Sequence, residues 1–261
     1  MAIFRRPAQR FWRRMANRRR RNKRRRSGKL KRGIIWAIRI AVLVVVLDIF
    51  YLSLIWPDWS KLEAARLDST AFIDNYKAQR KANPDWPPLR WHQVRLGAIP
   101  KYIPQAVIVA EDGRFYEHSG FDLQAFKEAM TYNLEKLNFK YGASTISQQV
   151  TKNLFLTGSR NPLRKWHELV LTMAMERNLS KRRILELYVN IAEFGKGIYG
   201  VAAAARYYYG VDTVDLSRWQ SAELAASLPS PRKHNPHTRT KRFERRAKKI
   251  YKYMSWVKAK T

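Results

Sequence analysis

Two adjacent carboxylates, Glu111 and Asp112, stand at the end of an apolar run and are the first candidates for chemistry. Residues 107–109 are Val, Ile and Val, so a helix would deliver both carboxylates to its end. A carboxylate held against apolar neighbours has its charged form disfavoured, and its pKa rises toward the range useful to a general base. Phe115 and His118 follow closely and are expected to support this site. A plain ion-pair role for the two carboxylates is the alternative.

A polar stretch at residues 142–153 combines hydroxyl, amide and ammonium groups at helical spacing. If Ser144 starts a helix there, then Ser144, Gln148 and Lys152 fall on one face of it. Such a stripe beside a helix N-terminus suits a sugar-phosphate ligand, and a solvated polar face is the alternative. The other face is apolar and can be buried, with Ile146, Val150 and Leu154.

A third stretch, residues 160–168, is rich in basic side chains. Arg160, Arg164 and Lys165 could form a forked anion site for phosphate. Alternatively, Arg164 and Glu168 form a surface ion pair one helical turn apart, worth about 0.3–0.5 kcal/mol. The core face of this helix is expected to hold Trp166, Leu169, Val170 and Met173.

Residues 181–190 indicate structure more than chemistry. Ile184, Leu187, Tyr188 and Ile191 have the spacing of a helix core face. Glu186 and Asn190 are expected to brace the site from behind. The chain has no cysteine, and its five histidines form no metal-ligand spacing, so the sequence predicts no certain metal site.

The elements that must position these residues follow an apolar segment at 33–56, which is long enough to cross a bilayer. Sixteen basic residues and no acid precede it, which places the N-terminus in the cytoplasm by the positive-inside bias. The body then faces outward. Asp48 lies inside the segment, where a charge marks a partner contact or a function, or is simply tolerated.

The net charge of +32 is concentrated at the two ends of the chain. Residues 33–231 carry 24 basic and 19 acidic side chains, so the body between the ends is nearly balanced. This distribution argues against a uniformly basic nucleic-acid binder. The arginine-rich arm resembles nucleic-acid arms in composition, but the predicted topology places it beside the anionic inner leaflet, where it would act as an anchor.

The remaining patterns predict a mainly α fold with little strand, at most near residues 91–96. We expect a helix near 60–80, and one capped by Asp122 that buries Leu123, Phe126, Met130, Leu134 and Leu137. Ser217 and Gln220 form a capping box that opens another helix. The expected organisation is a basic cytoplasmic arm (1–32), a transmembrane helix (33–56), a membrane-proximal linker (57–90), a catalytic domain (91–235) and a basic tail (236–261).

Taken in order, five stretches resemble the peptidoglycan glycosyltransferases of family 51. They are EDGRFYEHSGFD, GASTISQQVTKN, RKWHE, KRRILELYVN and GVAAAARYYYG, spread over roughly residues 92–235. Five co-linear motifs are far more specific than any one alone. The resemblance implies a lysozyme-like fold and a reaction that polymerises lipid-linked GlcNAc-MurNAc-pentapeptide into β-1,4 glycan, with inversion and release of polyprenyl pyrophosphate.

The resemblance also implies roles for individual residues. Glu111 matches the catalytic general base, and Glu168 matches a second glutamate that assists through the pyrophosphate or a bound metal. Lys152 and Arg160 match positions that hold the donor's pyrophosphate. Ser144, Gln148, Gln149 and Arg164 match binding or site-shaping positions, and the supporting set is Asp112, Phe115, His118, Glu186 and Asn190.

The implied partners are the lipid-linked precursor, membrane lipids and, through the transmembrane helix, proteins of cell division or cell-wall synthesis, with no nucleic acid. No cofactor is expected to be required, although a divalent cation, Mg²⁺ or Mn²⁺, assisting the pyrophosphate stays open. The expected location is the inner membrane, with the catalytic domain in the periplasm. A lysozyme-like peptidoglycan hydrolase or lytic enzyme is the nearest alternative, followed by a membrane-tethered basic scaffold.

Overall fold

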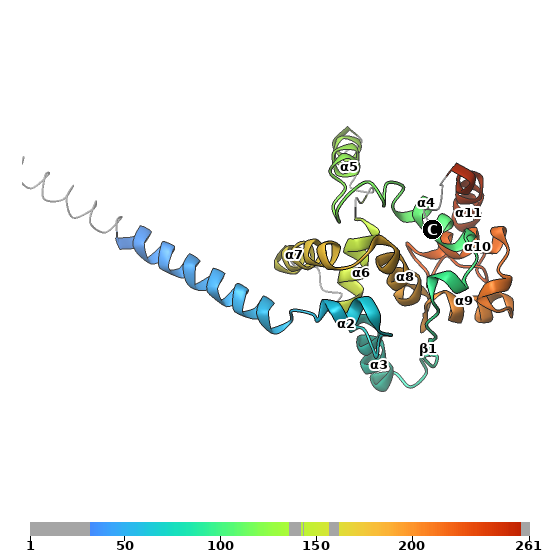
Figure 1. The fold of residues 1–261 in the computed structure, drawn as a ribbon, viewed down its shortest axis with the longest axis horizontal. Coiled ribbons are helices and arrows are strands. Elements are labelled where there is room, and N and C mark those ends of the chain that lie inside the picture. Colours follow the sequence, from blue (N-terminus) through green and yellow to red (C-terminus); the bar gives the residue numbers. More distant parts are fainter. Residues whose placement is uncertain (1–31, 136–141, 143, 157–161, 257–261) are drawn as a thin grey trace, which may run out of the picture. The chain divides into compact units, whose positions relative to one another are not determined.

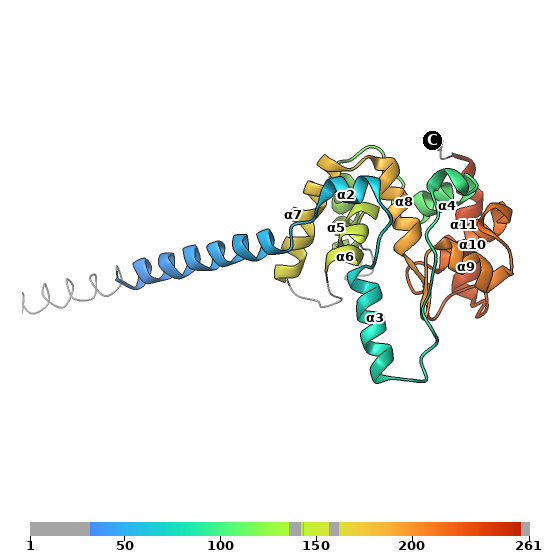
Figure 2. The ribbon, with the colours of Figure 1, turned by 60° about the horizontal axis from the view of Figure 1, so that its bottom comes forward.

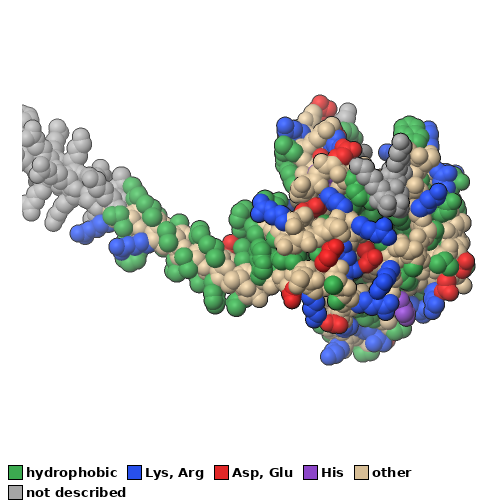
Figure 3. Space-filling view, in the orientation of Figure 1, with side chains coloured by type: hydrophobic (Ala, Val, Ile, Leu, Met, Phe, Trp, Pro, Cys, Tyr) green, Lys and Arg blue, Asp and Glu red, His purple; other side chains and the backbone are tan. Residues whose placement is uncertain are grey.

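The computed structural model describes residues 32–135, 142, 144–156 and 162–256, which belong to two compact units, Met1–Trp56 and Pro57–Thr261. In the first unit, the helix Arg32–Leu54 has 23 residues and is apolar enough to cross a membrane by length and composition. Hydrophobic side chains cover its visible face (Figure 3). Its bounds lie within two residues of the predicted segment 33–56.

The second unit is mainly helical, as predicted (Figure 1). Its α-helices are α2 (Trp59–Ala64), α3 (Ala71–Ala82), α4 (Tyr102–Glu111), α5 (Leu123–Glu135), α6 (Ile146–Phe155), α7 (Pro162–Asn178), α8 (Lys181–Ile191), α9 (Val201–Tyr209), α10 (Arg218–Ser227) and α11 (Lys241–Tyr253). Short 3-10 turns are η1 (Leu96–Ala98), η2 (Thr213–Asp215) and η3 (Met254–Trp256). The strands are β1 (Arg90–Trp91), β2 (Glu193–Gly195) and β3 (Ile198–Tyr199).

Helix α8 lies between two groups of helices (Figures 1 and 2). One group contains α2, α5, α6 and α7, and the other contains α4, α9, α10 and α11. Helix α8 packs against α6 on one side and against α4 and α9 on the other. Its predicted core residues, Ile184, Leu187, Tyr188 and Ile191, are all buried. The sequence therefore located the central helix correctly.

The capping box predicted at Ser217 and Gln220 is confirmed and opens α10. The predicted cap of α6 is wrong by one residue, because Thr145 and not Ser144 is the N-cap. The Thr145 hydroxyl accepts from the Gln148 backbone N–H, and the Gln148 side chain accepts from the Thr145 N–H, both at 3.2 Å. This reciprocal pair satisfies two backbone groups that Ser144 would leave free.

The apolar faces of α5 and α7 do not point where the sequence predicts. On α5 the expected core residues Leu123, Phe126, Met130 and Leu134 are exposed, and Leu137 lies outside the described residues. On α7, Trp166 and Met173 are exposed and Leu169 and Val170 are half-buried. The buried face instead carries His167, Glu168, Leu171, Thr172, Ala174 and Met175. An amphipathic pattern fixes two faces of a helix but not which of them meets the protein.

The α6–α7 contact shows why the polar face of α7 turns inward. The Thr172 hydroxyl lies 3.1 Å from the Thr151 hydroxyl of α6 and 2.6 Å from the Glu168 carbonyl oxygen, to which it donates. The two helices thus bury matched polar groups, which removes the desolvation cost of the inward-facing side.

A three-stranded sheet in the order β1-β3-β2 was missed apart from its first strand. β1 pairs with β3 in parallel and β2 pairs with β3 antiparallel. The predicted strand at 91–96 is only partly right, since β1 ends at Trp91. Beyond it the backbone groups of Val94 and Leu96 bond to side chains of α8 in place of a neighbouring strand.

The helix expected near residues 60–80 is two helices, α2 and α3. Helix α2 ends at Ala64. Thr70 then caps α3 by accepting from the Ile73 N–H at 3.1 Å. Arg183 of α8 donates to the carbonyl oxygens of Leu62 and Ala65 at the end of α2. The end of α2 is therefore stabilised by a residue far away in sequence, which the local pattern cannot indicate.

Residues 241–254 belong to the folded body, which corrects the prediction of a basic tail over 236–261. On α11 and η3, Phe243, Ala247, Ile250 and Met254 are buried in one cluster with residues of α4 and α10. Their spacing of four, three and four residues forms a single apolar stripe on a helix that is otherwise basic. The many basic side chains of this segment make its apolar stripe hard to recognise in the sequence.

Phe243→Ala should lower the free energy of unfolding by about 3–5 kcal/mol, because it removes a fully buried ring from the cluster that joins α11 to α4 and α10. Urea unfolding of the full chain in detergent measures the change. Lys248→Ala, on the exposed side of the same helix, is the matched control and should stay within about 0.5 kcal/mol of the parent. Equal stability of the two variants would contradict the placement of α11 in the core.

Candidate active site

Helix α4 brings Glu111 to a position between the two helix groups. Ile103, Ala106, Val107 and Ile108 bury the apolar face of α4, and the helix ends at Glu111. The Glu111 side chain is 12% exposed. Its Oε1 accepts from Arg246 Nη2 of α11 at 2.8 Å, and its Oε2 accepts from Gln149 Nε2 of α6 at 2.9 Å. One carboxylate therefore links three helices.

Burial is the largest influence on the pKa of Glu111 and raises it above its usual value. The hydrogen bond from Gln149 and the charges of Arg246 and Lys152 act in the opposite direction without cancelling the effect. The result is a carboxyl group that is desolvated yet held in place by two donors. Such a group can accept a proton at a pH closer to neutrality than a free glutamate.

Tyr188 of α8 fixes the orientation of Gln149. Burial raises the pKa of Tyr188 well above its usual value, so its hydroxyl stays protonated and donates to Gln149 Oε1 at 3.2 Å. That bond assigns the Gln149 amide so that its Nε2 faces Glu111. The chain Tyr188–Gln149–Glu111 thus connects the central helix to the candidate base.

Asp112 ties the end of α4 to the start of α6. Its Oδ2 accepts from the Ile146 N–H at 2.9 Å, and its Oδ1 lies 3.0 Å from His118 Nε2. His118 Nδ1 accepts from the Gly120 N–H at 3.1 Å, which leaves Nε2 as the donor to Asp112. Phe115 is fully buried beside them.

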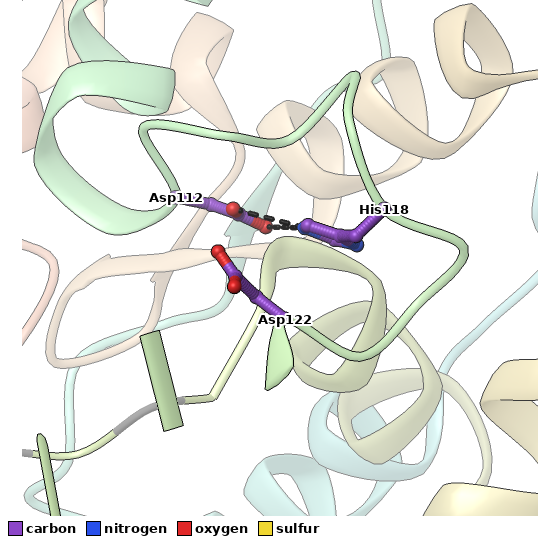
Figure 4. A group of neighbouring side chains, drawn as sticks. All are labelled: Asp112, His118 and Asp122. Carbon is purple, nitrogen blue, oxygen red and sulfur yellow. Dashed lines mark hydrogen bonds and ion pairs between the residues drawn. The ribbon is translucent and has the colours of Figure 1, made fainter. Parts of the chain in front are cut away.

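The side chains of Asp112, His118 and Asp122 lie close enough for their ligand atoms to fall within 4.8 Å of one another (Figure 4). Their chemistry does not fit a metal ion. Asp122 is bonded to Arg114 at 2.9 and 3.1 Å and caps α5, while Asp112 and His118 are used as described above. A bound cation would have to displace the guanidinium and both backbone donors, so we assign this cluster to structure.

A second charged group surrounds Glu168 on α7. This carboxylate is buried, with Arg164 Nη1 at 2.7 Å from its Oε2 and Lys165 Nζ paired with its Oε1. Burial lowers the pKa of Lys152, the charge of Glu168 opposes that effect, and Arg164 and Lys165 reinforce it. Three cations thus face one buried carboxylate, an excess of positive charge that suits a phosphate ligand.

The buried Nε of Arg164 has no hydrogen-bond partner within the described part of the chain. The Arg164 side chain is 18% exposed, and its other end is held by Glu168. A buried donor without an acceptor costs free energy. An anionic oxygen arriving at this group would therefore be stabilised by a donor that is already positioned.

The structure brings together some of the predicted site residues and separates others. Gln149 contacts Glu111, whereas Gln148 is buried in the capping box and Ser144 is exposed before α6 begins. The predicted stripe of Ser144, Gln148 and Lys152 is therefore wrong, because the helix starts one residue later and Gln148 turns back to its cap. Arg160 lies outside the described residues.

Glu186 and Asn190 both hold the segment that leads into α4. Glu186 Oε2 accepts from the Leu96 N–H at 2.7 Å. The Asn190 amide bonds to both the N–H and the carbonyl oxygen of Val94 at 2.8 Å. Their geometry is that of a brace behind the candidate site.

Arg246 is a site residue that the local sequence pattern does not predict. It is one of eight basic residues from Arg239 to Lys252, and nothing in that run distinguishes it. The apolar stripe of α11 would have shown that the segment is a packed helix, but the partner of Arg246 is 135 residues away in sequence. The ion pair between Arg246 and Glu111 forms because α11 packs against α4.

Comparison with known proteins adds independent information. The transglycosylase family profile matches residues 87–255, a range that contains every described residue of the site from Glu111 to Arg246. This chain belongs to the transglycosylase family. Its catalytic domain is lysozyme-like, as the sequence resemblance implied.

Three similar proteins each carry the name biosynthetic peptidoglycan transglycosylase. The one from Thiobacillus denitrificans is 43% identical over 189 residues, covering 72% of this chain and 82% of the relative. That of Laribacter hongkongensis is 40% identical over 190 residues, covering 72% and 83%. That of Acinetobacter baumannii is 40% identical over 216 residues, covering 82% and 91%.

Asp112→Asn should lower the free energy of unfolding by about 1–3 kcal/mol, because an amide cannot accept from both the Ile146 N–H and His118 as a carboxylate does. Thermal or urea unfolding of the full chain measures the loss. The exposed Asp85→Asn is the matched control and should change stability by less than about 0.5 kcal/mol. If Asp112→Asn matches that control, the anchoring role of Asp112 is wrong.

Proposed function

We propose that this transglycosylase is a peptidoglycan glycosyltransferase that polymerises lipid-linked GlcNAc-MurNAc-pentapeptide into β-1,4 glycan and releases polyprenyl pyrophosphate. The observation that carries the proposal is a desolvated carboxylate, Glu111, beside a group of cations on α6 and α7. Family membership and the names of the relatives support the same activity. The two parts of the site correspond to the two events of the reaction, which are proton removal and departure of a pyrophosphate that gains negative charge as its bond to the sugar breaks.

In this proposal Glu111 takes the proton from the acceptor's 4-hydroxyl as that oxygen attacks the donor's anomeric carbon. Attack from the face opposite the pyrophosphate inverts the α linkage to β. Gln149 and Arg246 hold the carboxylate in place, so its proton-accepting oxygen does not have to reorient during the step. Glu111 gains the proton, and the bond to the leaving pyrophosphate breaks as the new glycosidic bond forms.

Lys152, Arg164 and Lys165, together with Arg160, are proposed to offset the charge that develops on the pyrophosphate. Glu168 keeps Arg164 and Lys165 in position. The described residues around Glu168 do not fit a divalent cation, because both of its oxygens already accept from protein cations. We therefore assign the neutralisation of the leaving group to these side chains and no step to Mg²⁺ or Mn²⁺.

Two features of the chain that suit a membrane also support the proposed function. The helix Arg32–Leu54 can serve as an anchor, and the catalytic unit exposes large apolar side chains on α5 and α7, among them Leu123, Phe126, Trp166 and Met173. Exposed apolar faces of this extent mark contact surfaces. We propose a single-pass protein of the inner membrane with a periplasmic catalytic domain, a lipid-linked substrate and cell-wall synthesis proteins as partners.

A lysozyme-like hydrolase is the alternative that shares this fold. Most glycosidases need a second free carboxylate across the scissile bond, as nucleophile or as base. Here Asp112 is committed to Ile146 and His118, and Glu168 to two cations. A hydrolase that cuts a glycan backbone also has no use for the cations around Glu168. The other alternative, a membrane-tethered basic scaffold, does not explain why Glu111 is desolvated.

Glu111→Gln should lower the rate of glycan polymerisation by at least about 10²–10⁴-fold while the protein stays folded, because glutamine cannot accept the proton. The measurement is product sizing after incubation of the full chain with lipid-linked disaccharide precursor. The exposed Glu117→Gln is the matched control and should retain full activity. Polymerisation by Glu111→Gln at the parent rate would refute the proposed base, and shortening of preformed glycan by the parent protein would favour the hydrolase.

Arg246→Gln should shift the acid limb of the pH–rate profile to higher pH. The base acts when it is deprotonated, so the rate rises with pH through the pKa of Glu111. The charge of Arg246 lowers that pKa against the effect of burial, and its removal raises it. The variant should therefore lose most activity at low pH and recover at high pH.

Arg245→Gln, the exposed neighbour on α11, is the control and should leave the profile in place. A uniform loss of activity by Arg246→Gln at every pH, with no shift of the limb, would show that Arg246 acts only on structure.

A further inference from the structure

A pocket of about 390 Å³ lies beside α8, outside the residues assigned to catalysis. Its walls come from the end of α2, the segment 93–95 and one face of α8 from Arg182 to Asn190. Glu186 and Asn190 of α8 line it, while Tyr188 of the same helix contacts Gln149 in the candidate active site. At 100° per residue these are different faces of the helix, so α8 separates the two sites. We call this cavity the arginine pocket.

Four arginines line the pocket, and they come from three separate segments: Arg66, Arg95, Arg182 and Arg183. Arg183 has a structural task, since it bonds to Leu62, Ala65 and Glu186. The other three are exposed and form no hydrogen bond or ion pair with the described residues. Three unpaired guanidinium groups thus meet around one cavity.

The acidic side chains in the pocket do not neutralise this group. Glu186 is paired with Arg183 and accepts from the Leu96 N–H. Glu63 accepts from the Ser180 hydroxyl at 3.1 Å and is the one remaining acid among the lining residues. Setting the Arg183–Glu186 pair aside, three positive charges face one negative charge. Like charges held close together without a counter-ion are unfavourable, and an anion would relieve the repulsion.

The walls of the pocket are already held in place. Gln93 bonds to both the N–H and the carbonyl oxygen of Leu67, at 2.9 and 2.7 Å, and so joins the segment 93–95 to the chain after α2. Asn190 joins the same segment to α8 through Val94. Arg183 joins α8 to α2. A ligand would therefore order only the three arginine side chains, which keeps the entropic cost of binding low.

We propose that the arginine pocket is a binding site for a phosphate group, held by Arg66, Arg95 and Arg182. Guanidinium groups pair with phosphate oxygens in bidentate geometry, and several of them converging favour a multiply charged oxyanion over a carboxylate. The phosphate can belong to a phospholipid headgroup or to a soluble phosphate. Glu63, which lines the pocket, follows Leu54, the last residue of the apolar helix, by nine positions in the sequence.

The site goes beyond the proposed glycosyl transfer and does not depend on it, since none of its residues contacts Glu111 or the cations around Glu168. Its test therefore uses a readout other than polymerisation. Failure of one proposal leaves the other standing.

The test measures how fast an arginine-selective dicarbonyl reagent modifies each arginine of the full chain in a neutral maltoside detergent, read residue by residue by mass spectrometry. Inorganic phosphate is titrated in one arm. In a second arm, phosphatidylglycerol in the micelles is compared with diacylglycerol, which lacks the phosphate. At twice the dissociation constant of the ligand, mass action predicts that modification of Arg66, Arg95 and Arg182 slows by about threefold.

Arg177 is the internal control, because it is exposed on α7 and does not line the pocket. Its modification rate should not change. Protection by both probes supports recognition of the phosphate group itself. Protection by phosphatidylglycerol alone supports a lipid headgroup as the ligand, and protection by inorganic phosphate alone supports a soluble ligand. No protection by either probe, or equal protection of Arg177, overturns the proposal.

A variant pair tests whether the three arginines act together. Arg66→Gln should weaken the protection of Arg95 and Arg182 by either probe, because one of three converging charges is lost. Arg177→Gln is the matched control and should leave that protection as it is in the parent. Unchanged protection in Arg66→Gln would also overturn the proposal, since the other two arginines would then be responding to general screening.

Discussion

The rest of this structure depends on the burial of one carboxylate, Glu111, where three helices meet. Placing a charge there is unfavourable unless donors are brought to it, and the donors come from far apart in the chain. Gln149 on α6 and Arg246 on α11 supply them. The packing of α6 and α11 around α4 places these two side chains at the end of α4 and keeps them there.

Neighbouring residues with similar chemistry have opposite duties around this point. Glu111 faces the candidate site, whereas Asp112 faces the start of α6 and joins it to the turn that contains His118. Lys152 and Arg246 are both basic and both influence Glu111, yet one lies beside the cations of α7 and the other belongs to the packed helix α11. Position in the fold, not residue type, separates a supporting group from a reacting one.

The apolar surface follows the same logic. Helices α5 and α7 have strong apolar faces that are turned outward, because the inward side of α7 is used for Glu168 and for the threonine contacts with α6. A protein that acts on a lipid-linked substrate can leave such faces exposed at a membrane, where they are not a liability.

Much of this organisation can be derived from the amino-acid sequence, because it rests on local patterns. The apolar segment, the central helix α8, the capping box at Ser217 and the placement of Glu111 at a helix end all follow from spacing and capping chemistry within one element. The five co-linear motifs were enough to indicate the family. Each of the structural inferences needs only residues that are neighbours along the chain, and the family resemblance needs only the order of the motifs.

What could not be derived depends on contacts between elements that are distant in sequence. The pairing of Arg246 with Glu111, the outward faces of α5 and α7, and the convergence of Arg66, Arg95 and Arg182 have no local signal. A periodic pattern states which residues share a face, but the partner of that face is chosen by the free energy of the whole packed body. In this protein the packing of α11 against α4 brings Arg246 to Glu111, so a segment that the sequence suggests is a basic tail belongs to the candidate active site.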